Sequence, residues 1–249
     1  MNPRPGLSAL LALSLVACGG VDRQTAGEPA PSFGDRTPPP MRVLVIGGTS
    51  GIGLETVKLA LARGHEVSAM ARRPERMTLT HARLRTIKGD ITHPDAVSAA
   101  VDGHDAVVST IGIGPTRKSV TVFSTGMKNV LAAMDEHGVA RLIAVTGIGA
   151  GDSRGHGGLV YDVFTRPVLP KTIYADKDRE EELIRASDTD WTIVRPGFLE
   201  DGPSRAQYRV IQDLAGISAG DIDRADVAHF IVYALESGRY VGTTPLLTN

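Results

Sequence analysis

Cysteine is almost absent from this chain, because Cys18 is the single one among 249 residues. One thiol excludes a disulfide within the chain and a zinc site built from several cysteines, and we expect no metal site. A surplus of positive charge is also missing. The 27 lysines and arginines face 28 aspartates and glutamates, so the net charge is −1. This balance gives no electrostatic reason to expect nucleic acid as a partner.

A long hydrophobic run is missing as well. The apolar run 7–17 is too short to span a bilayer as a helix, but it fits the hydrophobic region of a secretory signal. It ends in "LVAC", which is similar to a bacterial lipobox with Cys18 as the lipid acceptor. We therefore predict a lipoprotein signal peptide over 1–18, a flexible Gly/Pro-rich tether over 19–40 and a folded domain over 41–249. The protein would then contact a membrane only through the lipid on Cys18.

A second start site is the alternative. Met41 opens "MRVLVIGG", which is a natural beginning for a fold whose first element is a strand. If translation begins at Met41, residues 1–40 are not part of the native protein and the domain is cytoplasmic. The position of the lone cysteine favours the lipoprotein, and both alternatives stay open.

From residue 42 onward, short apolar runs alternate with helical patterns. Strands are expected at 42–46, 65–71, 84–90, 105–112, 141–147 and 191–197, with an edge strand within 240–248. Helices are expected at 51–63, 94–101, 119–137, 172–187 and around 227–235. Strands that alternate with helices imply parallel pairing through right-handed crossovers. We therefore predict one α/β domain, a doubly wound parallel sheet of the Rossmann type with a small C-terminal extension on the substrate side.

Glycines interrupt the chain directly after the first strand, in "VLVIGGTSGIGLE". Gly47 allows a sharp turn, Gly51 leaves no Cβ between the backbone and a diphosphate, and Gly53 lets helix and strand pack closely. The helix that follows offers free N–H groups and the positive end of its dipole to phosphate. The loop therefore predicts a dinucleotide site, with Thr49, Ser50 and Ile52 completing it. A tight turn that binds nothing is the alternative.

An acidic residue is missing at the end of the second strand, where NAD-binding chains hold the ribose hydroxyls with a carboxylate. The sequence there reads Ala-Met-Ala and continues with Arg72 and Arg73. Guanidinium groups pair well with a phosphate, which favours NADP while leaving NAD possible. The alternative is a solvated pair of arginines beside Glu75.

Taken together, the motifs resemble one family. "VLVIGGTSGIG", "ARRPER", "IKGDITHPDAV", "DAVVSTIG", "GMKNVLAAMDEHGVARLIAVTGIGAG", "KDREEELIRASDTDWTIVRPG" and "DRADVAHFIVYAL" occur in the order seen in atypical short-chain dehydrogenase/reductases. More narrowly, they are similar to the NAD(P)H-binding branch that includes NmrA-like proteins and biliverdin-IXβ/flavin reductases. The resemblance covers residues 42 to about 247.

The resemblance implies roles for further residues. Asp90 and Ile91 would contact the adenine, and Pro196 would lie beside the nicotinamide. Thr146 occupies the place of the family's catalytic serine or threonine, and Lys177 that of the family lysine, which binds the cofactor ribose. The loop beyond the fourth strand would line the ribose region with Ser109, Thr110, Ile111 and Gly112.

The family's tyrosine is missing from its usual position four residues before the lysine, where Ile173 stands. Tyr174 lies three residues before Lys177, still on the same helical face, and it is the candidate proton donor. Each candidate has a plainer alternative. Tyr174 could be a packing or surface residue, Lys177 could pair with Glu181 on a solvated helix, and Thr146 could bond to backbone.

Two segments are expected to form the acceptor walls, 149–171 and 198–208. A structural role is expected for Asp226, and a catalytic one is not expected for His156. The resulting hypothesis is a reductase that passes a hydride from NADPH to a small, flat acceptor such as a flavin or quinone. The alternative is an NmrA-like protein that senses the cofactor without turnover. The sequence leaves the acceptor and the oligomeric state open.

Overall fold

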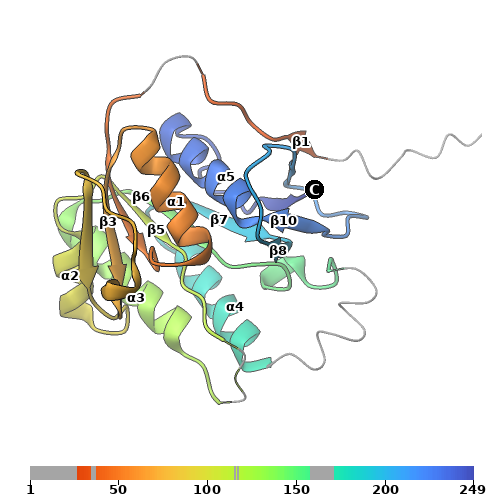
Figure 1. The fold of residues 1–249 in the computed structure, drawn as a ribbon. Helices are drawn as coiled ribbons and strands as arrows, with labels where there is room; N and C mark the ends of the chain where they lie inside the picture. The colour runs from red at the N-terminus through yellow and green to blue at the C-terminus, as the bar shows by residue number, and fades with distance from the viewer. Residues whose placement is uncertain (1–26, 35–37, 115, 117, 158–170) are drawn as a thin grey trace, which may run out of the picture.

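The computed structural model describes residues 27–34, 38–114, 116, 118–157 and 171–249. Helices flank a nine-stranded sheet (Figure 1). The strands are β1 (Glu28–Pro29), β2 (Arg42–Ile46), β3 (Glu66–Ala71), β4 (Leu84–Lys88), β5 (Ala106–Ser109), β6 (Arg141–Val145), β7 (Asp190–Pro196), β8 (Phe198–Glu200), β9 (Arg209–Ile211), β10 (Asp221–Asp223) and β11 (Leu246–Thr248). The helices are α1 (Gly51–Ala62), α2 (Pro94–Val101), α3 (Val122–His137), α4 (Lys171–Arg185) and α5 (Arg224–Ser237), with short 3₁₀ turns at Pro74–Arg76 and Gly151–Ser153.

The sheet has the order β1-β9-β11-β7-β6-β5-β2-β3-β4. From β4 to β11 all neighbours pair in parallel, while β9 and β1 add antiparallel pairs at one edge. The chain first builds outward from β2 through β3 to β4 and then returns to the other side of β2 with β5. This reversal opens a crevice beyond the carboxyl ends of β2 and β5, where doubly wound sheets bind ligands.

Helices cover the sheet on both faces. Helices α1 and α5 pack side by side on one face, and α2, α3 and α4 cover the other (Figure 1). The strands between these layers are therefore buried on both sides, and Val43, Leu44 and Val45 of β2 are fully enclosed. This double burial explains why β2 reads as an unbroken apolar run. The predicted α/β fold, a doubly wound Rossmann-type sheet in one domain, is confirmed.

Three features of the strands differ from the predictions. Strand β5 ends at Ser109, three residues before the predicted end, and both the backbone N–H and the hydroxyl of Thr110 donate to the carbonyl oxygen of Ile46, at 2.9 and 3.0 Å. Strands β8, β9 and β10, with three residues each, were not predicted, because such runs are too short to show a period. Strand β11 was expected at an edge and instead lies between β7 and β9.

The expectation of a flexible tether is wrong for residues 27–34. Glu28–Pro29 forms β1, which pairs with β9, and the ring of Phe33 lies 4.8 Å from that of His229. The Arg63 guanidinium covers Phe33 at 4.2 Å from the ring centroid. An aromatic side chain and a sheet edge that lacked a partner thus fix this segment. The predicted signal peptide, Cys18 and the remainder of the tether up to residue 26 lie outside the described residues.

No helix in the part of the chain that the structure describes is both long and apolar enough to cross a membrane.

Candidate functional site

A cavity of about 770 Å³ opens at the carboxyl ends of β2, β3, β5, β6 and β7. This volume is typical of sites for cofactors and small molecules. Among the predicted site residues within the described part of the chain, Gly53 and Ser109 do not line the cavity, and both are buried. Those that line it are Gly47, Thr49, Ser50, Gly51, Ile52, Arg72, Arg73, Asp90, Ile91, Thr110, Ile111, Gly112, Thr146, Tyr174, Lys177 and Pro196.

The glycine loop forms one end of the cavity. Gly47 has a φ of +87° and Gly51 one of +55°, so both positions favour glycine. A Cβ on Gly53 would overlap the carbonyl oxygen of Gly47 and Oγ1 of Thr110, so Gly53 serves the close packing of α1 against the loop. Ser50, the N-cap of α1, makes no side-chain capping bond to the helix. The hydroxyl and the N–H groups of the first turn can therefore bind an anion.

The end of the cavity beyond β3 is lined by three arginines. Arg72 and Arg73 line the cavity beside Arg76, which the sequence analysis missed. Both predicted arginines are exposed, as the alternative of a solvated pair requires, and neither forms an ion pair with Glu75 within the described residues, so both interpretations stay open. Arg76 comes into place because the 3₁₀ turn after β3 brings it back toward the strand end.

Asp90 lies nearby with its carboxylate already organised. Its Oδ1 accepts hydrogen bonds from the backbone N–H of Thr92 at 3.0 Å and from the Thr92 hydroxyl at 2.8 Å. The backbone hydrogen bond is the main cause that lowers the pKa of Asp90, with a further contribution from the charge of Arg72. The ionised Asp90 can therefore accept a hydrogen bond from a ligand N–H or O–H.

Lys177 projects from α4 into the middle of the cavity wall. Its Nζ lies 4.0 Å from the centroid of the Phe123 ring and 3.7 Å from Oε2 of Glu180. Both Nζ and Oε2 are buried and neither has a hydrogen-bond partner among the described residues. The pairing that the alternative gave to Glu181 is wrong, because Lys177 pairs with Glu180. Burial is the main cause that raises the pKa of the Glu180 carboxyl to about 7.

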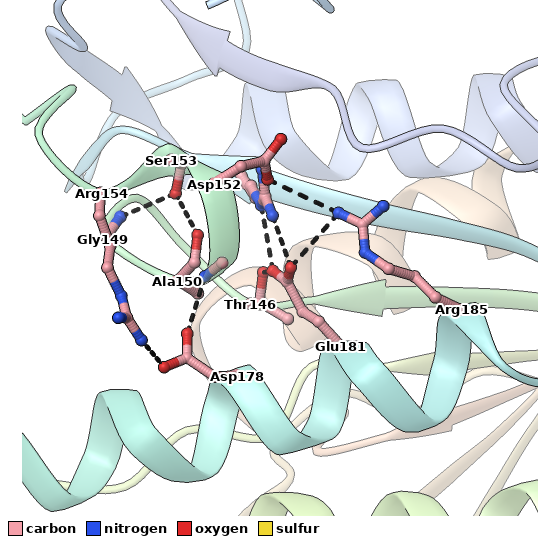
Figure 2. A network of polar contacts seen from close by, with 11 residues as sticks. Thr146, Gly149, Ala150, Asp152, Ser153, Arg154, Asp178, Glu181 and Arg185 are labelled. Atoms are coloured by element: carbon pink, nitrogen blue, oxygen red, sulfur yellow. Dashed lines mark hydrogen bonds and ion pairs between the residues drawn. The ribbon is translucent and has the colours of Figure 1, made fainter.

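Thr146 directly follows β6 and belongs to a buried polar network (Figure 2). Its hydroxyl donates to Oε1 of Glu181 at 2.8 Å, so the alternative of a bond to backbone is wrong. Arg195 binds the same carboxylate through Nε at 3.0 Å and Nη2 at 2.5 Å. The Nη1 atom of Arg195 pairs with Asp152 at 2.5 Å. Because Arg195 is fully buried, two carboxylates balance its charge.

The loop after β6 is held against α4 by the same group of residues. Asp178 accepts from the backbone N–H of Gly151 at 2.7 Å and pairs with Arg154, as Figure 2 shows. Ser153 bonds to the backbone of Gly149 and Ala150 in the same loop. These contacts hold residues 149–157 in place next to the cavity. The remainder of this predicted wall, 158–170, lies outside the described residues.

The other expected wall does reach the cavity, since Phe198 and Leu199 line it. Asp226 has the structural role expected for it, because its Oδ1 accepts from the Ser204 hydroxyl at 2.6 Å and from two backbone N–H groups that follow. His156 does not line the cavity. Its Nδ1 lies 2.9 Å from the carbonyl oxygen of Ile217, and this contact joins two loops.

Sequence reasoning missed several lining residues besides Arg76. Phe123, at the start of α3, supports Lys177. Arg224, at the start of α5, approaches the glycine loop at Gly51 and pairs with Asp201 at 2.7 Å. The "DRADVA" segment resembles the family motif, but nothing in its sequence indicates that the first helical residue approaches the glycine loop. Among the described residues, no group of three His, Cys, Asp or Glu side chains could hold a metal ion.

Comparisons with known proteins point to one family. The sequence model of a family described as NAD(P)H-binding matches residues 47–238. A Bacillus subtilis protein described as an uncharacterized sugar epimerase is 28% identical over 205 residues, covering 79% of this chain and 88% of its own. The chain spans only 31% of the length of a 3-beta-hydroxysteroid dehydrogenase from Mycolicibacterium neoaurum, to which it is 36% identical over 113 residues.

Solved structures show the same fold. An anaerobillin reductase from Escherichia coli O157:H7 superposes with a TM-score of 0.70 at 25% identity, covering 83% of this chain and 96% of the other. A short-chain dehydrogenase/reductase from Veillonella parvula, solved in complex with NADP, has a TM-score of 0.71 at 18% identity, with 84% and 94% coverage.

Proposed function

Since this chain belongs to the NAD(P)H-binding family of Rossmann-fold proteins, we propose that it is an NADPH-dependent reductase that passes a hydride to a small, flat acceptor. One observation carries the proposal. A single cavity joins the glycine loop and the guanidinium groups at one end to Thr146, Pro196 and Phe198 at the other. An extended dinucleotide carries phosphate groups toward its adenosine end and a flat ring at its nicotinamide end. The end of the cavity with the guanidinium groups suits the phosphates, and the end with Pro196 and Phe198 suits the ring.

The choice of NADPH over NADH rests on charge. Arg72 and Arg73 follow β3, and no carboxylate stands at the end of that strand to hold free ribose hydroxyls. A 2′-phosphate would give the two guanidinium groups the anionic partner that Glu75 does not provide. The relative from Veillonella parvula was solved with NADP, which is consistent with this preference.

The residues of this chain would bind the cofactor, orient its nicotinamide ring and shield that ring from water. The cofactor supplies a hydride from its nicotinamide ring when bound. The α1 N-terminus and the loop from Gly47 would hold the diphosphate, and Lys177 would donate its unused hydrogen bonds to ribose hydroxyls. Ile148, Pro196 and Phe198 would exclude water around the reacting ring. An acceptor such as a flavin or quinone can take its proton from water, so the missing tyrosine does not stop the reaction.

Turnover is the direct test. Purified protein is mixed with NADPH and, in turn, riboflavin, FMN and menadione, and the loss of reduced-nicotinamide absorbance is followed. We expect catalytic consumption of NADPH with at least one flavin or quinone and slower consumption of NADH. Tight NADPH binding with no turnover across the panel would contradict the reductase.

A second function is favoured by one observation. Ile173 stands where related reductases carry tyrosine, and the hydrogen of the Thr146 hydroxyl is already engaged by Glu181. A protein that binds NADP(H) and reports its redox state to a partner needs neither proton donor. Binding without turnover, together with different stability of the NADP⁺ and NADPH complexes, would support this alternative.

We also propose that the chain is anchored to a membrane by a lipid on Cys18. The lone cysteine at a lipobox supports this. Labelling of cells with a radioactive fatty acid should mark the wild-type chain but not Cys18→Ser, and globomycin should block processing. A product that begins at Met41 and carries no label would contradict the anchor and favour the cytoplasmic alternative.

A further inference from the structure

The hydroxyl of Thr146 has a defined polarity. Thr146 lines the cavity, and its Oγ1 is 2.8 Å from Oε1 of Glu181. Glu181 is 2% exposed, and its two oxygens accept hydrogen bonds from Nε and Nη2 of Arg195. A carboxylate that pairs with a guanidinium in this two-point manner is ionised.

An ionised carboxylate can accept hydrogen bonds but cannot donate one. The hydrogen between Thr146 and Glu181 therefore belongs to Thr146. A hydroxyl has one hydrogen and two lone pairs, so a ligand that reaches this hydroxyl finds only lone pairs. At this point the wall offers a hydrogen-bond acceptor and not a donor.

The network holds this orientation in place. Arg195 is fully buried, and its third nitrogen pairs with Asp152, so the guanidinium cannot turn away from Glu181 without losing both partners. Arg185 adds a second positive charge 3.7 Å from Oε2 of Glu181. With two guanidinium groups beside it, the Glu181 carboxylate keeps the same partners, and the direction of the Thr146 bond does not reverse.

The surroundings of Thr146 make the polarity selective. Ile148, Pro196 and Phe198 line the same part of the cavity and are apolar. A polar edge of a bound molecule that finds no partner here loses its hydrogen bond to water without replacement. A carbonyl that faced Thr146 would meet lone pairs, whereas an N–H or O–H would be satisfied.

We propose that Thr146 accepts a hydrogen bond from the acceptor molecule, so that the site selects flat acceptors with an N–H or O–H on the edge that faces β6. This inference rests on the proposed reductase function and specifies its substrate class. Ring systems of the flavin or pyrrole type, which carry N–H groups, fit the requirement. Quinones and simple ketones, which carry only carbonyl oxygens, do not.

A matched pair of probes tests the proposal. Lumichrome is flat, fluorescent and carries two ring N–H groups, and 1,3-dimethyllumichrome has the same rings with both N–H groups methylated. Each is titrated into the protein saturated with NADP⁺, with fluorescence as the readout. We expect lumichrome to bind at least about five-fold more tightly to the wild-type protein, the difference that one neutral hydrogen bond makes.

Two variants assign the preference to Thr146. In Thr146→Val the hydroxyl is lost and the shape is kept, so the ratio of the two affinities should fall to about one. In Thr146→Ser the hydroxyl stays and the ratio should persist. A preference that survives in Thr146→Val would have a steric or unrelated cause and would contradict the proposal.

The outcomes separate this proposal from the function on which it rests. Equal binding of the two probes by the wild-type protein, with NADPH turnover intact, overturns the polarity of the site and leaves the reductase standing. Absence of NADP⁺ binding in the same samples overturns the reductase and this inference with it. The wild-type comparison alone decides between these results, even where a variant fails to fold.

Discussion

Lys177 is the residue whose environment points most clearly to a ligand. Its Nζ is buried, lies over the Phe123 ring and lacks a hydrogen-bond partner among the described residues. A buried ammonium group without hydrogen bonds is costly, and ribose hydroxyls would satisfy it.

Replacing this lysine should weaken cofactor binding. We expect Lys177→Met to reduce the affinity for NADPH by about 10- to 100-fold, the value of hydrogen bonds to a charged group. Lys128→Met, on the exposed side of α3, is the matched control and should leave affinity unchanged. Calorimetric titration measures both. Equal affinities of the two variants would show that Lys177 does not contact the cofactor.

The stability of the protein should depend on the protonation of Glu180. The folded pKa of about 7 lies above the ordinary value of 4.5, so between these values the folded carboxyl keeps a proton that the unfolded chain releases. Stability contributed by this proton is present below pH 4.5 and is lost as the pH rises through 7.

Glu180→Gln removes this dependence. Relative to the wild type, the variant should gain up to roughly 3 kcal/mol between pH 4.5 and pH 8, because one pKa unit corresponds to about 1.4 kcal/mol. Urea denaturation at both pH values measures the change. The neighbouring Glu182→Gln, which is exposed, should show no gain. A constant difference between Glu180→Gln and wild type across this range would contradict the assignment.

At the residue scale, the sequence predicted the groups whose function depends on their local spacing. Gly47, Gly51, Arg72 and Arg73 lie next to a strand end, so their place in the cavity follows from the strand alone. The partner of Thr146 could not be predicted in this way. Glu181 comes from a helix 35 residues further along, and only packing decides which carboxylate on that helix turns inward.

At the scale of elements, α3 and α4 are joined by a cap that spans the two helices. Thr121, the N-cap of α3, makes no side-chain bond to that helix. Asp176 of α4 takes this role, because its Oδ2 accepts from the backbone N–H of Phe123 at 2.9 Å. Helix α3 thus begins where a carboxylate from another helix satisfies its free N–H groups.

Removing the cap should loosen the start of α3. We expect Asp176→Ala to cost about 1 to 3 kcal/mol of stability, because a buried N–H loses its partner, and Asp176→Asn, which keeps an acceptor, to cost less. Urea denaturation gives both values. Stability of Asp176→Ala equal to that of wild type would show that the cap contributes nothing.

Gly53 controls the distance between α1 and the glycine loop. Gly53→Ala places a Cβ against the Gly47 carbonyl and should lower NADPH affinity by at least about tenfold, with about 1 to 3 kcal/mol lost from stability. Gly34→Ala, where a Cβ meets nothing within 4 Å, is the control. Wild-type affinity in Gly53→Ala, measured by calorimetry, would contradict the close packing proposed for this turn.

Elements with a long apolar run could be predicted from the sequence, whereas strands of only three residues could not. Strands β2, β5 and β6 are buried on both faces and show this as continuous apolar runs. Strands β8, β9 and β10 have three residues each, which is less than any period needs. Strand β11 lies inside the sheet because β9 pairs beside it. The order of strands in a sheet cannot be predicted from the sequence of a single segment.

At the scale of the whole molecule, the segment 27–34 belongs to the fold. Phe33 lies between the Arg63 guanidinium and the ring of His229, and Tyr240 donates to Glu28 at 3.2 Å. The segment therefore covers α5 from outside the sheet. Its composition gave no sign of this, because its contacts are all with residues distant in sequence.

Phe33→Ala tests whether this segment stabilises the domain. We expect a loss of about 1 to 2 kcal/mol from the cation–π contact and the partly buried ring. Val241→Ala replaces an exposed apolar side chain, 44% accessible, and should change stability by less than about 0.5 kcal/mol. If both variants unfold at the same urea concentration, the segment contributes nothing to the stability of the domain.

Calorimetric titration of the wild-type protein with NADPH and with NADH tests the central claim most directly. We expect both to bind at one site per chain and NADPH to bind at least about tenfold more tightly, because its 2′-phosphate reaches the guanidinium groups after β3. Absence of heat with either dinucleotide, or equal or tighter binding of NADH, would contradict it.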